Sequence, residues 1–518
     1  MGAPACTGSS PPATCPRWPL DGDRCLIELE LSLPPDDATR LPRLRQLAAL
    51  KVGRARNQPI RIVWHDTPSA DLLSQGRAVA EQRGLWRLEQ VGPNGREWPL
   101  GAPSPVLAEA ASAAALDPPP PEMLMPVAAF EGRAIALDLL RESEAVSLRL
   151  LDGVMRGVTA ERRAARLRMA GDAGAVTALA LDLAGEFAVA IPCAALASES
   201  IAAARAGQPA ARRLGAASLP SDLSVAAAFA HVTSHLADVM LHWGASIAAV
   251  PQTGEARALE PVHQMRVAMR RLRSAMSQFP AAAEAPLLEE TRRGLKALSD
   301  ILGPARDWDV FCSETGLAVG EAFTPEAQVG RLLAVAERRR TEHYATLRQF
   351  LEGVEYRRLM IRLAALAIPE SWAAAADPEQ PAALDQPLPA FAAAVLAKRL
   401  KRLQRAGEAI DHLDPAALHE IRLLGKRMRY AAELFSSLWP GKGPRRFIRR
   451  LTTLQESLGI LNDGAVAAQL MAELGGTGAE RAFAVGVVRG FVAGRGAAHR
   501  QEIARAWKRF RQTTPFWA

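Results

Sequence analysis

Two stretches of the sequence decide the fold: HQMRVAMRRLR at residues 263–273 and HEIRLLGKRMR at residues 419–429. In both, a histidine is followed by basic residues three, seven, eight and ten positions later. An α-helix turns by about 100° per residue, so the histidine and the residues at the third, seventh and tenth positions lie within roughly 80°. The opposite side of each segment is apolar. We therefore predict two amphipathic helices, each with one core face and one cationic face.

The two segments belong to a longer internal repeat. A constant offset of 156 residues relates them, and it also superposes phenylalanine, arginine, leucine, glycine and aspartate positions beyond them without an insertion. A repeat of this length in a helical region is typical of a duplicated helical bundle. The further matching pairs include Phe279 and Phe435, Arg293 and Arg449, Leu302 and Leu458, Gly303 and Gly459, and Asp307 and Asp463.

The cationic faces predict an anionic partner. The segment 263–273 contains no acid, and 419–429 contains only Glu420. Like charges three or four residues apart on a helix repel each other, so a bound polyanion would supply the missing counter-charge. The charge of the whole chain agrees with this. The formal net charge is +8, with −2 in residues 1–210 and +10 in residues 211–518. The basic excess therefore lies in the helical half.

Several protein classes are not favoured. The sequence has no charge-free apolar run of about 18 residues, so we expect no membrane-spanning helix. The five cysteines form no C-x-x-C pair, which fits a reducing cytoplasm better than a disulfide scaffold or a zinc site. Residues 1–20 are rich in Pro, Ser, Thr and Gly, and we expect a disordered tail without a signal peptide.

The segment before the repeats reads as a mixture of strands and helices. The stretch CLIELELSL at residues 25–33 alternates with period two, which predicts a strand with Glu28 and Glu30 on one face. We expect an α+β multidomain chain, with an N-terminal domain at 21–208, a linker at 209–221 and an all-α domain at 222–515 divided into halves at about 222–370 and 390–515. Further strands are predicted at residues 60–64, 84–91, 145–151 and 164–170, and helices at 41–50 and 175–184.

The two His-x-x-Arg-x-x-x-[Arg/Lys]-Arg-x-Arg helices resemble the CHAD family, the conserved histidine α-helical domain. Each is followed by an LG-x-x-x-D turn, LGPARDWDVF at 302–311 and LGILNDGAVA at 458–467, and the resemblance covers about residues 220–515. It implies two pseudo-symmetric bundles around a basic channel that binds inorganic polyphosphate. It also implies that Asp307 and Asp463 cap a helix or orient an arginine. The implied ligand-facing residues are His263, Arg266, Arg270, Arg273, His419, Arg422, Lys426 and Arg429. Arg271 and Arg427 flank them, Tyr430 assists, and the further basic residues Arg293 and Arg449 would extend the channel.

The N-terminal domain resembles the CYTH family, the triphosphate tunnel metalloenzymes. Glu28-Leu-Glu30-Leu-Ser32 is similar to the Glu-x-Glu-x-Lys signature of that family, whose fold is an antiparallel β-barrel. The resemblance implies that Glu28 and Glu30 would hold Mg²⁺ or Mn²⁺ if this domain is active. The sequence departs from the pattern, however. Serine replaces the signature lysine, and Arg166 and Arg168 stand where the family has metal-binding glutamates. We therefore expect a degenerate, inactive barrel.

The leading interpretation is a bacterial cytoplasmic protein that binds inorganic polyphosphate through the CHAD-like channel and associates with polyphosphate granules. Polyphosphate binding itself would need no cofactor. A second interpretation is an Mg²⁺- or Mn²⁺-dependent triphosphatase or polyphosphatase, in which the helical domain captures the substrate. A third is a nucleic-acid-binding protein, because basic channels also bind nucleic acids. The sequence predicts no membrane partner, and it leaves the oligomeric state and the preferred chain length open.

Overall fold

The computed structural model describes most of the 518-residue chain. The tail predicted at residues 1–20 lies outside the described residues, as do parts of the predicted linker and of the segment between the predicted halves. The described residues are 26–90, 106–107, 123–157, 161–205, 215–249, 259–279, 286–324, 326–368, 372, 384–408, 410, 414–474, 478–497 and 500–517.

The N-terminal region is an eight-stranded antiparallel sheet with the order β1-β8-β7-β6-β2-β3-β4-β5. All the strands predicted from the sequence are present, and most are longer than predicted because paired neighbours extend them. The strands are β1 (Leu26–Leu33), β2 (Lys51–Asp66), β3 (Arg77–Gln82), β4 (Leu85–Gln90), β5 (Val106–Leu107), β6 (Met125–Arg141), β7 (Glu144–Arg156) and β8 (Glu161–Asp172).

The sheet is a half-barrel, so the antiparallel β-barrel that the resemblance implied is present in part. Within the described residues, β1 and β5 are the two edges and do not pair with each other. The strand β5 has two residues that pair only with Trp86 and Arg87, which is too short an edge to complete a barrel. The helix α4 (Leu196–Ala204) packs against strands β3, β6, β7 and β8 and covers part of the face that would line a tunnel.

The opposite face of the sheet joins the helical region through one continuous apolar core. Leu29, Leu31 and Leu167 of the sheet belong to the same buried cluster as residues of the helical region. The helix α3 (Ala173–Glu186) lies between them and packs on α10 (Val354–Leu366). Arg357 and Arg358 of α10 donate hydrogen bonds to the carbonyl oxygens of Ala184 and Leu181, at 3.4 and 3.3 Å. The exposed carbonyls at the end of α3 are thereby satisfied.

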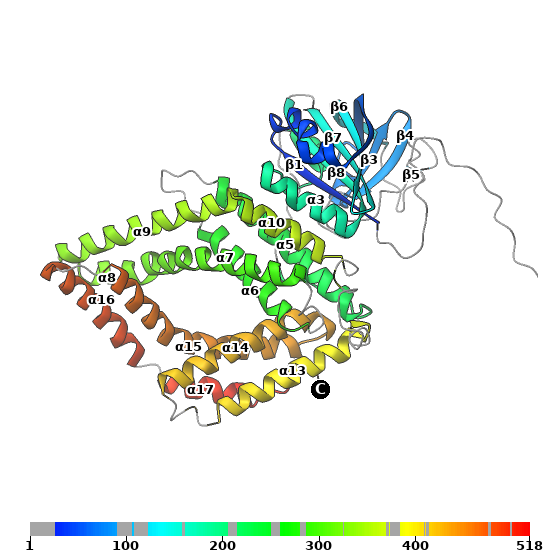
Figure 1. Ribbon diagram of the computed structural model, residues 1–518. Coiled ribbons are helices and arrows are strands. Elements are labelled where there is room, and N and C mark those ends of the chain that lie inside the picture. Colours follow the sequence, from blue (N-terminus) through cyan, green and yellow to red (C-terminus); the bar gives the residue numbers. More distant parts are fainter. Residues whose placement is uncertain are drawn as a thin grey trace, which may run out of the picture.

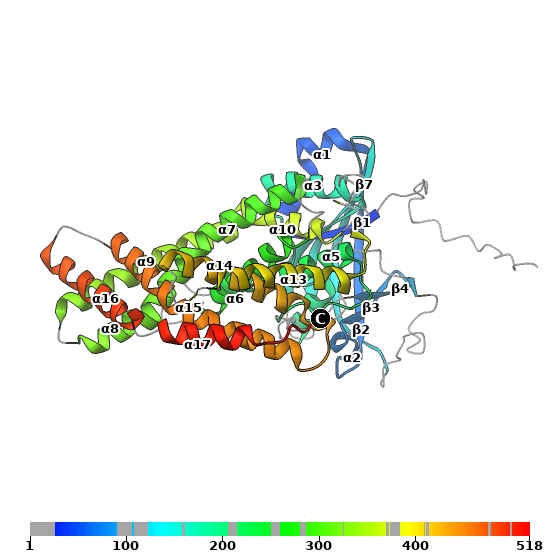
Figure 2. The same ribbon diagram turned by 90° about the horizontal axis from the view of Figure 1, so that it is seen from below.

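The rest of the chain is helical and extends away from the sheet (Figures 1 and 2). In Figure 1, α6, α7 and α9 form one side of this region and α13, α14 and α15 form the other, while α16 meets α9 at the far end. The helices are α5 (Val225–Ala249), α6 (Leu259–Met276), α7 (Pro286–Val310), α8 (Gly316–Ala322), α9 (Ala327–Glu352), α10, α13 (Leu388–Ala406), α14 (Pro415–Phe435), α15 (Gly443–Glu473), α16 (Ala479–Ala497) and α17 (Arg500–Arg511).

The two amphipathic helices predicted at residues 263–273 and 419–429 lie within α6 and α14. Their predicted apolar faces are buried, including Met265 and Leu272 on α6 and Ile421 and Met428 on α14. The LG-x-x-x-D segments are not turns as expected. The first lies at the end of α7 and runs into a π-helical turn at Phe311–Thr315, and the second lies inside α15. The surrounding helical register continues through both glycines because each is flanked by buried leucines of the repeat.

Short helical elements complete the N-terminal region. The stretch predicted as one helix at residues 41–50 is divided into a 3-10 turn at Leu41–Arg43 and the helix α1 (Arg45–Leu50). Another 3-10 turn spans Asp37–Thr39, and α2 (Asp71–Ser74) follows β2. A proline at position 42 provides the physical reason for the tighter first turn, because it cannot donate a backbone hydrogen bond.

Candidate anion-binding cavity

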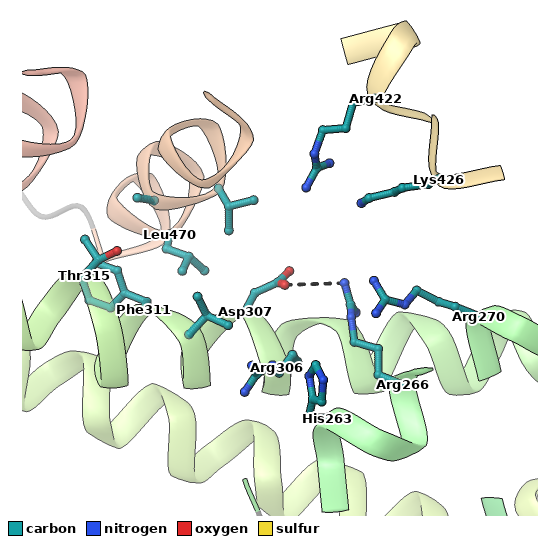
Figure 3. Close-up of a pocket in the computed structure, with 13 residues that line it drawn as sticks. His263, Arg266, Arg270, Arg306, Asp307, Phe311, Thr315, Arg422, Lys426 and Leu470 are labelled. Carbon is teal, nitrogen blue, oxygen red and sulfur yellow. Dashed lines mark ion pairs between the residues drawn. The ribbon is translucent and has the colours of Figure 1, made fainter. Parts of the chain in front are cut away.

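A cavity of about 370 Å³ lies between α6 and α7 on one side and α14 and α15 on the other (Figure 3). Basic side chains from three of these helices converge on it. Val466, Ala467 and Leu470 of α15 contribute an apolar wall, together with residues at the end of α7. The residues that line the cavity are His263, Arg266, Arg270, Arg306, Asp307, Val310, Phe311, Thr315, Arg422, Lys426, Val466, Ala467 and Leu470.

The lining reflects the internal repeat. Four pairs of lining residues are related by the 156-residue offset, two of them basic and two of them apolar. Equivalent positions of the two copies therefore face one cavity, even though they are far apart in the chain. These pairs are Arg266 and Arg422, Arg270 and Lys426, Val310 and Val466, and Phe311 and Ala467.

Arg306 is a functional candidate that the sequence analysis missed. It lies on α7 and lines the cavity close to His263 (Figure 3). The 156-residue offset pairs Arg306 with Asn462, so a search for matching positions passes over it. One sequence signal could have identified Arg306: it precedes Asp307 within the LG-x-x-x-D segment. This segment forms the end of α7, where both residues line the cavity.

Arg266 is held in place by residues of α7. Its guanidinium lies 3.7 Å from the carboxylate of Asp307, a half-exposed ion pair that Figure 3 marks with a dashed line. Asp307 therefore orients an arginine, while its position within α7 rules out a role as a helix cap. Gly303 is one turn earlier on the same helix. A Cβ atom at Gly303 would come within 3.1 Å of the Arg266 guanidinium, so the glycine leaves room for this side chain.

The convergence of cations perturbs their proton affinities. Burial, together with repulsion from Arg422, Arg270 and Arg266, lowers the pKa of Lys426 to about 8. Burial and repulsion from neighbouring arginines, Arg306 foremost, lower the pKa of His263 below its ordinary value, so the imidazole is mostly neutral at pH 7. Without an anion, the cavity therefore concentrates positive charge that is only partly compensated.

A second group of predicted residues lies beside the cavity and is paired with Glu433 of α14. Arg271 and Arg429 each lie 3.4 Å from a carboxylate oxygen of Glu433. The ring of Tyr430 is buried, and the guanidinium carbons of Arg270 and Arg429 lie 6.0 and 5.2 Å from its centre. These contacts crosslink α6 and α14. Arg271 and Arg429 therefore have a counter-charge within the protein, which the pattern of the two helices did not reveal.

The remaining predicted residues are not brought to the cavity. Arg273 donates a hydrogen bond to Ser299, at 3.2 Å, and Arg293 lies 4.0 Å from Glu290. His419, Arg427 and Arg449 are exposed on α14 and α15 and are absent from the cavity lining. Arg427 is one residue beyond Lys426, and this step of about 100° turns it away from the cavity. Asp463 lies in α15, but its side chain is outside the described residues.

A buried network supports α7 beside the cavity. Asp309 is fully buried and pairs with the Nε atom of Arg340 on α9, at 2.7 Å. The hydroxyl of Tyr344 donates a second hydrogen bond to Asp309, also at 2.7 Å. A buried carboxylate satisfied by two partners is a specific crosslink. This network fixes the segment of α7 that carries Arg306 and Asp307.

The N-terminal residues proposed as metal ligands do not form a metal site. Glu30 is held by Arg168, at 2.7 Å, and by Arg166, at 3.4 Å, and it accepts a hydrogen bond from the backbone of Leu196 at 3.3 Å. Burial alone would raise the pKa of Glu30, but these two arginines outweigh burial and hold the pKa below its ordinary value. A divalent cation beside Glu30 would face both guanidinium groups, so these residues do not fit Mg²⁺ or Mn²⁺.

In the part of the chain that the structure describes, no group of three or more His, Cys, Asp and Glu side chains is arranged to hold a metal ion. Among the described helices, none is both long enough and apolar enough to span a membrane.

Residues 242–472 match the family model of the CHAD domain. The chain contains a CHAD domain. The match begins within α5 and ends within α15, so it includes α6, α7, α14 and every residue that lines the cavity. The CHAD match is narrower than the helical domain predicted at residues 222–515.

The chain is similar to two curated proteins. Uncharacterized proteins from two strains of Mycobacterium tuberculosis, H37Rv and CDC 1551, are 32% and 31% identical over 186 residues. Each match covers 34% of this chain and 34% of the relative, so the chain spans about a third of the length of these relatives.

Two solved structures also align with the chain. One is the crystal structure of the CHAD domain from the plant Ricinus communis, with 27% identity and a TM-score of 0.49, covering 58% of this chain and 96% of that one. The other is PptA from Streptomyces chartreusis, with 19% identity and a TM-score of 0.42, covering 55% of this chain and all of that one.

Proposed function

We propose that this protein binds inorganic polyphosphate in the cavity between α6, α7, α14 and α15. The observation that carries the proposal is the convergence of Arg266, Arg270 and Arg306 with Arg422 and Lys426 from the other copy of the repeat. Arginine forks bind phosphate oxygens in pairs, and lysine adds a point charge. The CHAD-like sequence pattern supports the same ligand class.

The electrostatics of the cavity favour a polyanion. Asp307 is the one carboxylate among the described residues that line it. A phosphate bound among these side chains would relieve the repulsion that contributes to the lowered pKa of Lys426. The free protein is therefore organised for a partner that supplies several negative charges close together.

We propose that the N-terminal region is a degenerate CYTH-like scaffold. Its Glu30 is neutralised by Arg166 and Arg168, and α4 covers part of the face on which these residues lie. Its other face shares a core with the helical region. In this proposal the sheet stabilises the helical region, which has two pseudo-symmetric halves, and the whole chain associates with polyphosphate granules in the cytoplasm.

Nucleic acid is the main competing polyanion. A single strand carries a base on every sugar-phosphate unit, and proteins that bind it without sequence preference supply aromatic rings for these bases. At the cavity, Phe311 is only 3% exposed and Tyr430 is buried beneath two arginines. Near the basic side chains of the cavity, the described residues therefore offer no exposed aromatic ring on which successive bases could stack. An unbranched phosphate chain without bases fits these basic side chains better.

Binding is tested with the full-length protein and a short inorganic polyphosphate by isothermal titration calorimetry. The double variant Arg266→Ala with Arg422→Ala removes one cation from each side of the cavity. We expect it to lose at least a hundredfold in affinity while its thermal unfolding changes little. Arg43→Ala with Arg45→Ala is the matched control, because it removes two exposed arginines of the N-terminal region. Equal losses in the two double variants would contradict the assignment of the cavity.

Two further assays separate the alternatives. In competition at equal phosphate concentration, we expect inorganic polyphosphate to displace single-stranded DNA. The reverse order would favour the nucleic-acid interpretation. We also expect no phosphate release from tripolyphosphate in Mg²⁺ or Mn²⁺. Release that is abolished by Glu28→Gln with Glu30→Gln would establish the triphosphatase instead.

A further inference from the structure

The cavity has two chemically different ends. Arg266, Arg270, Arg422 and Lys426 gather at one end, while Phe311, Thr315 and Leu470 lie at the other (Figure 3). The four cations at the first end come from α6 and α14. The apolar side chains come from the last residue of α7, from the π-helical turn that follows it and from α15, while Arg306 of α7 lies near His263. The cavity is therefore amphipathic along its length.

The apolar end is not required by an inorganic phosphate chain. Val310 and Val466 line the cavity and are only half-buried, while Phe311, Ala467 and Leu470, their neighbours in the lining, are buried. Phosphate oxygens lose hydrogen bonds to water when they contact such a surface and receive none in return. An apolar or aromatic group gains free energy from the same contact. The lining therefore suits a ligand that carries such a group at one end of its phosphates.

Asp307 lies between the two ends of the cavity (Figure 3). A carboxylate can only accept hydrogen bonds, so it repels a phosphate but accepts a bond from a hydroxyl group. Its ion pair with Arg266 is long, 3.7 Å, and its side chain is 38% exposed, so an oxygen lone pair is available to a ligand. The middle of the preferred ligand therefore carries hydroxyl groups, as a sugar does.

We infer that the cavity accepts a nucleoside polyphosphate. The phosphates lie among the basic side chains, a ribose hydroxyl donates to Asp307, and the base contacts Val310 and Val466. The cavity volume of about 370 Å³ is within the range of pockets for ligands of this size. This inference rests on the proposed function, because it uses the same cationic end, and it extends the ligand class from inorganic to organic polyphosphates.

The test compares ATP with tripolyphosphate, which also has three phosphates but lacks the nucleoside. Both are titrated into the full-length protein in buffer with EDTA, at one ionic strength. We expect ATP to bind about tenfold more tightly, since burial of the base and the Asp307 contact add to the phosphate contacts. The variant Asp307→Asn also alters the ion pair with Arg266, so it can change the binding of both ligands, but it should weaken ATP binding more than tripolyphosphate binding because only ATP donates a ribose hydroxyl to Asp307.

A variant at the apolar end isolates the contribution of the base. Val466→Ser should remove most of the advantage of ATP while tripolyphosphate binds as before, and Val310→Ser serves as the second variant if the first lowers the melting temperature. The inference is overturned if ATP binds no more tightly than tripolyphosphate, or if both valine variants affect the two ligands equally. In either case the proposed function survives as long as tripolyphosphate binds. If neither ligand binds, the proposed function and the inference fail together.

Discussion

The lowered pKa of Lys426 predicts that anion binding depends on pH. With a pKa of about 8, Lys426 is about nine-tenths protonated at pH 7 and about one-tenth protonated at pH 9 in the unliganded protein. A bound phosphate favours the charged form and moves the pKa back toward its ordinary value. Affinity for polyphosphate should therefore fall about tenfold between pH 7 and pH 9, which corresponds to about 1.4 kcal/mol.

The same linkage predicts proton uptake during binding. At pH 9 we expect each binding event to take up about 0.9 proton, compared with about 0.1 at pH 7. The assay is calorimetric titration in several buffers that differ in ionisation enthalpy. The slope of the observed binding enthalpy against the ionisation enthalpy of the buffer gives the number of protons taken up per binding event. His263 contributes in a separate, more acidic window, because its pKa is lowered from an ordinary value near 6.5.

Two variants make the reasoning refutable. Lys426→Arg keeps the charge but cannot lose its proton in this range, so its affinity should be nearly constant from pH 7 to pH 9. Lys398→Arg is the matched control, since Lys398 is an exposed lysine of α13 outside the cavity, and it should behave like the unmodified protein. A full pH dependence in Lys426→Arg, or no proton uptake by the unmodified protein at pH 9, would refute the argument.

Three further predictions follow from particular contacts. Gly303→Ala should raise the melting temperature slightly, because alanine favours a helix, yet weaken polyphosphate binding several-fold by displacing Arg266; a gain in affinity would contradict the packing argument. Asp309→Asn leaves Arg340 with only the more exposed Glu337 as counter-charge and should lower the free energy of unfolding by about 3 kcal/mol in urea denaturation, and an unchanged midpoint would count against the network. At pH 7, affinity for a short polyphosphate should fall with salt at a log–log slope near −3.5. This slope reflects about five cations at about 0.7 each, namely the four lining arginines and the mostly protonated Lys426, and a slope near zero would remove the electrostatic basis of binding.

The pKa of Lys426 also affects the stability of the unliganded protein. The folded-state pKa of about 8 is below the ordinary value of 10.5. Between these two values the unfolded chain binds more protons than the folded chain. The free energy of unfolding should therefore rise with pH across this window, and saturating polyphosphate should abolish the rise. In the proposed function, the cationic cluster therefore lowers the stability of the unliganded protein, and a bound polyanion restores it.

The internal repeat made the helical part of the protein predictable. Helical periodicity is a local property, so it placed His263, Arg266 and Arg270 on one side of α6 and the buried Met265 on the other without knowledge of the partner helices. Strand alternation in the same way placed Glu30 and Leu29 on opposite faces of β1. The antiparallel barrel was confirmed only as a half-barrel. Closure depends on pairing between distant edges, and that pairing is not encoded in the alternation of any single strand.

The sequence by itself therefore determined which residues share a face, where the basic charge lies, and which two helices carry the cationic faces. The tertiary structure decided which of those cations converge. It turned Arg427 outward, paired Arg271 and Arg429 with Glu433, and added Arg306 from α7. The physical reason is that a face is set by rotation within one helix, whereas a cavity depends on how several helices, distant in the chain, pack against one another.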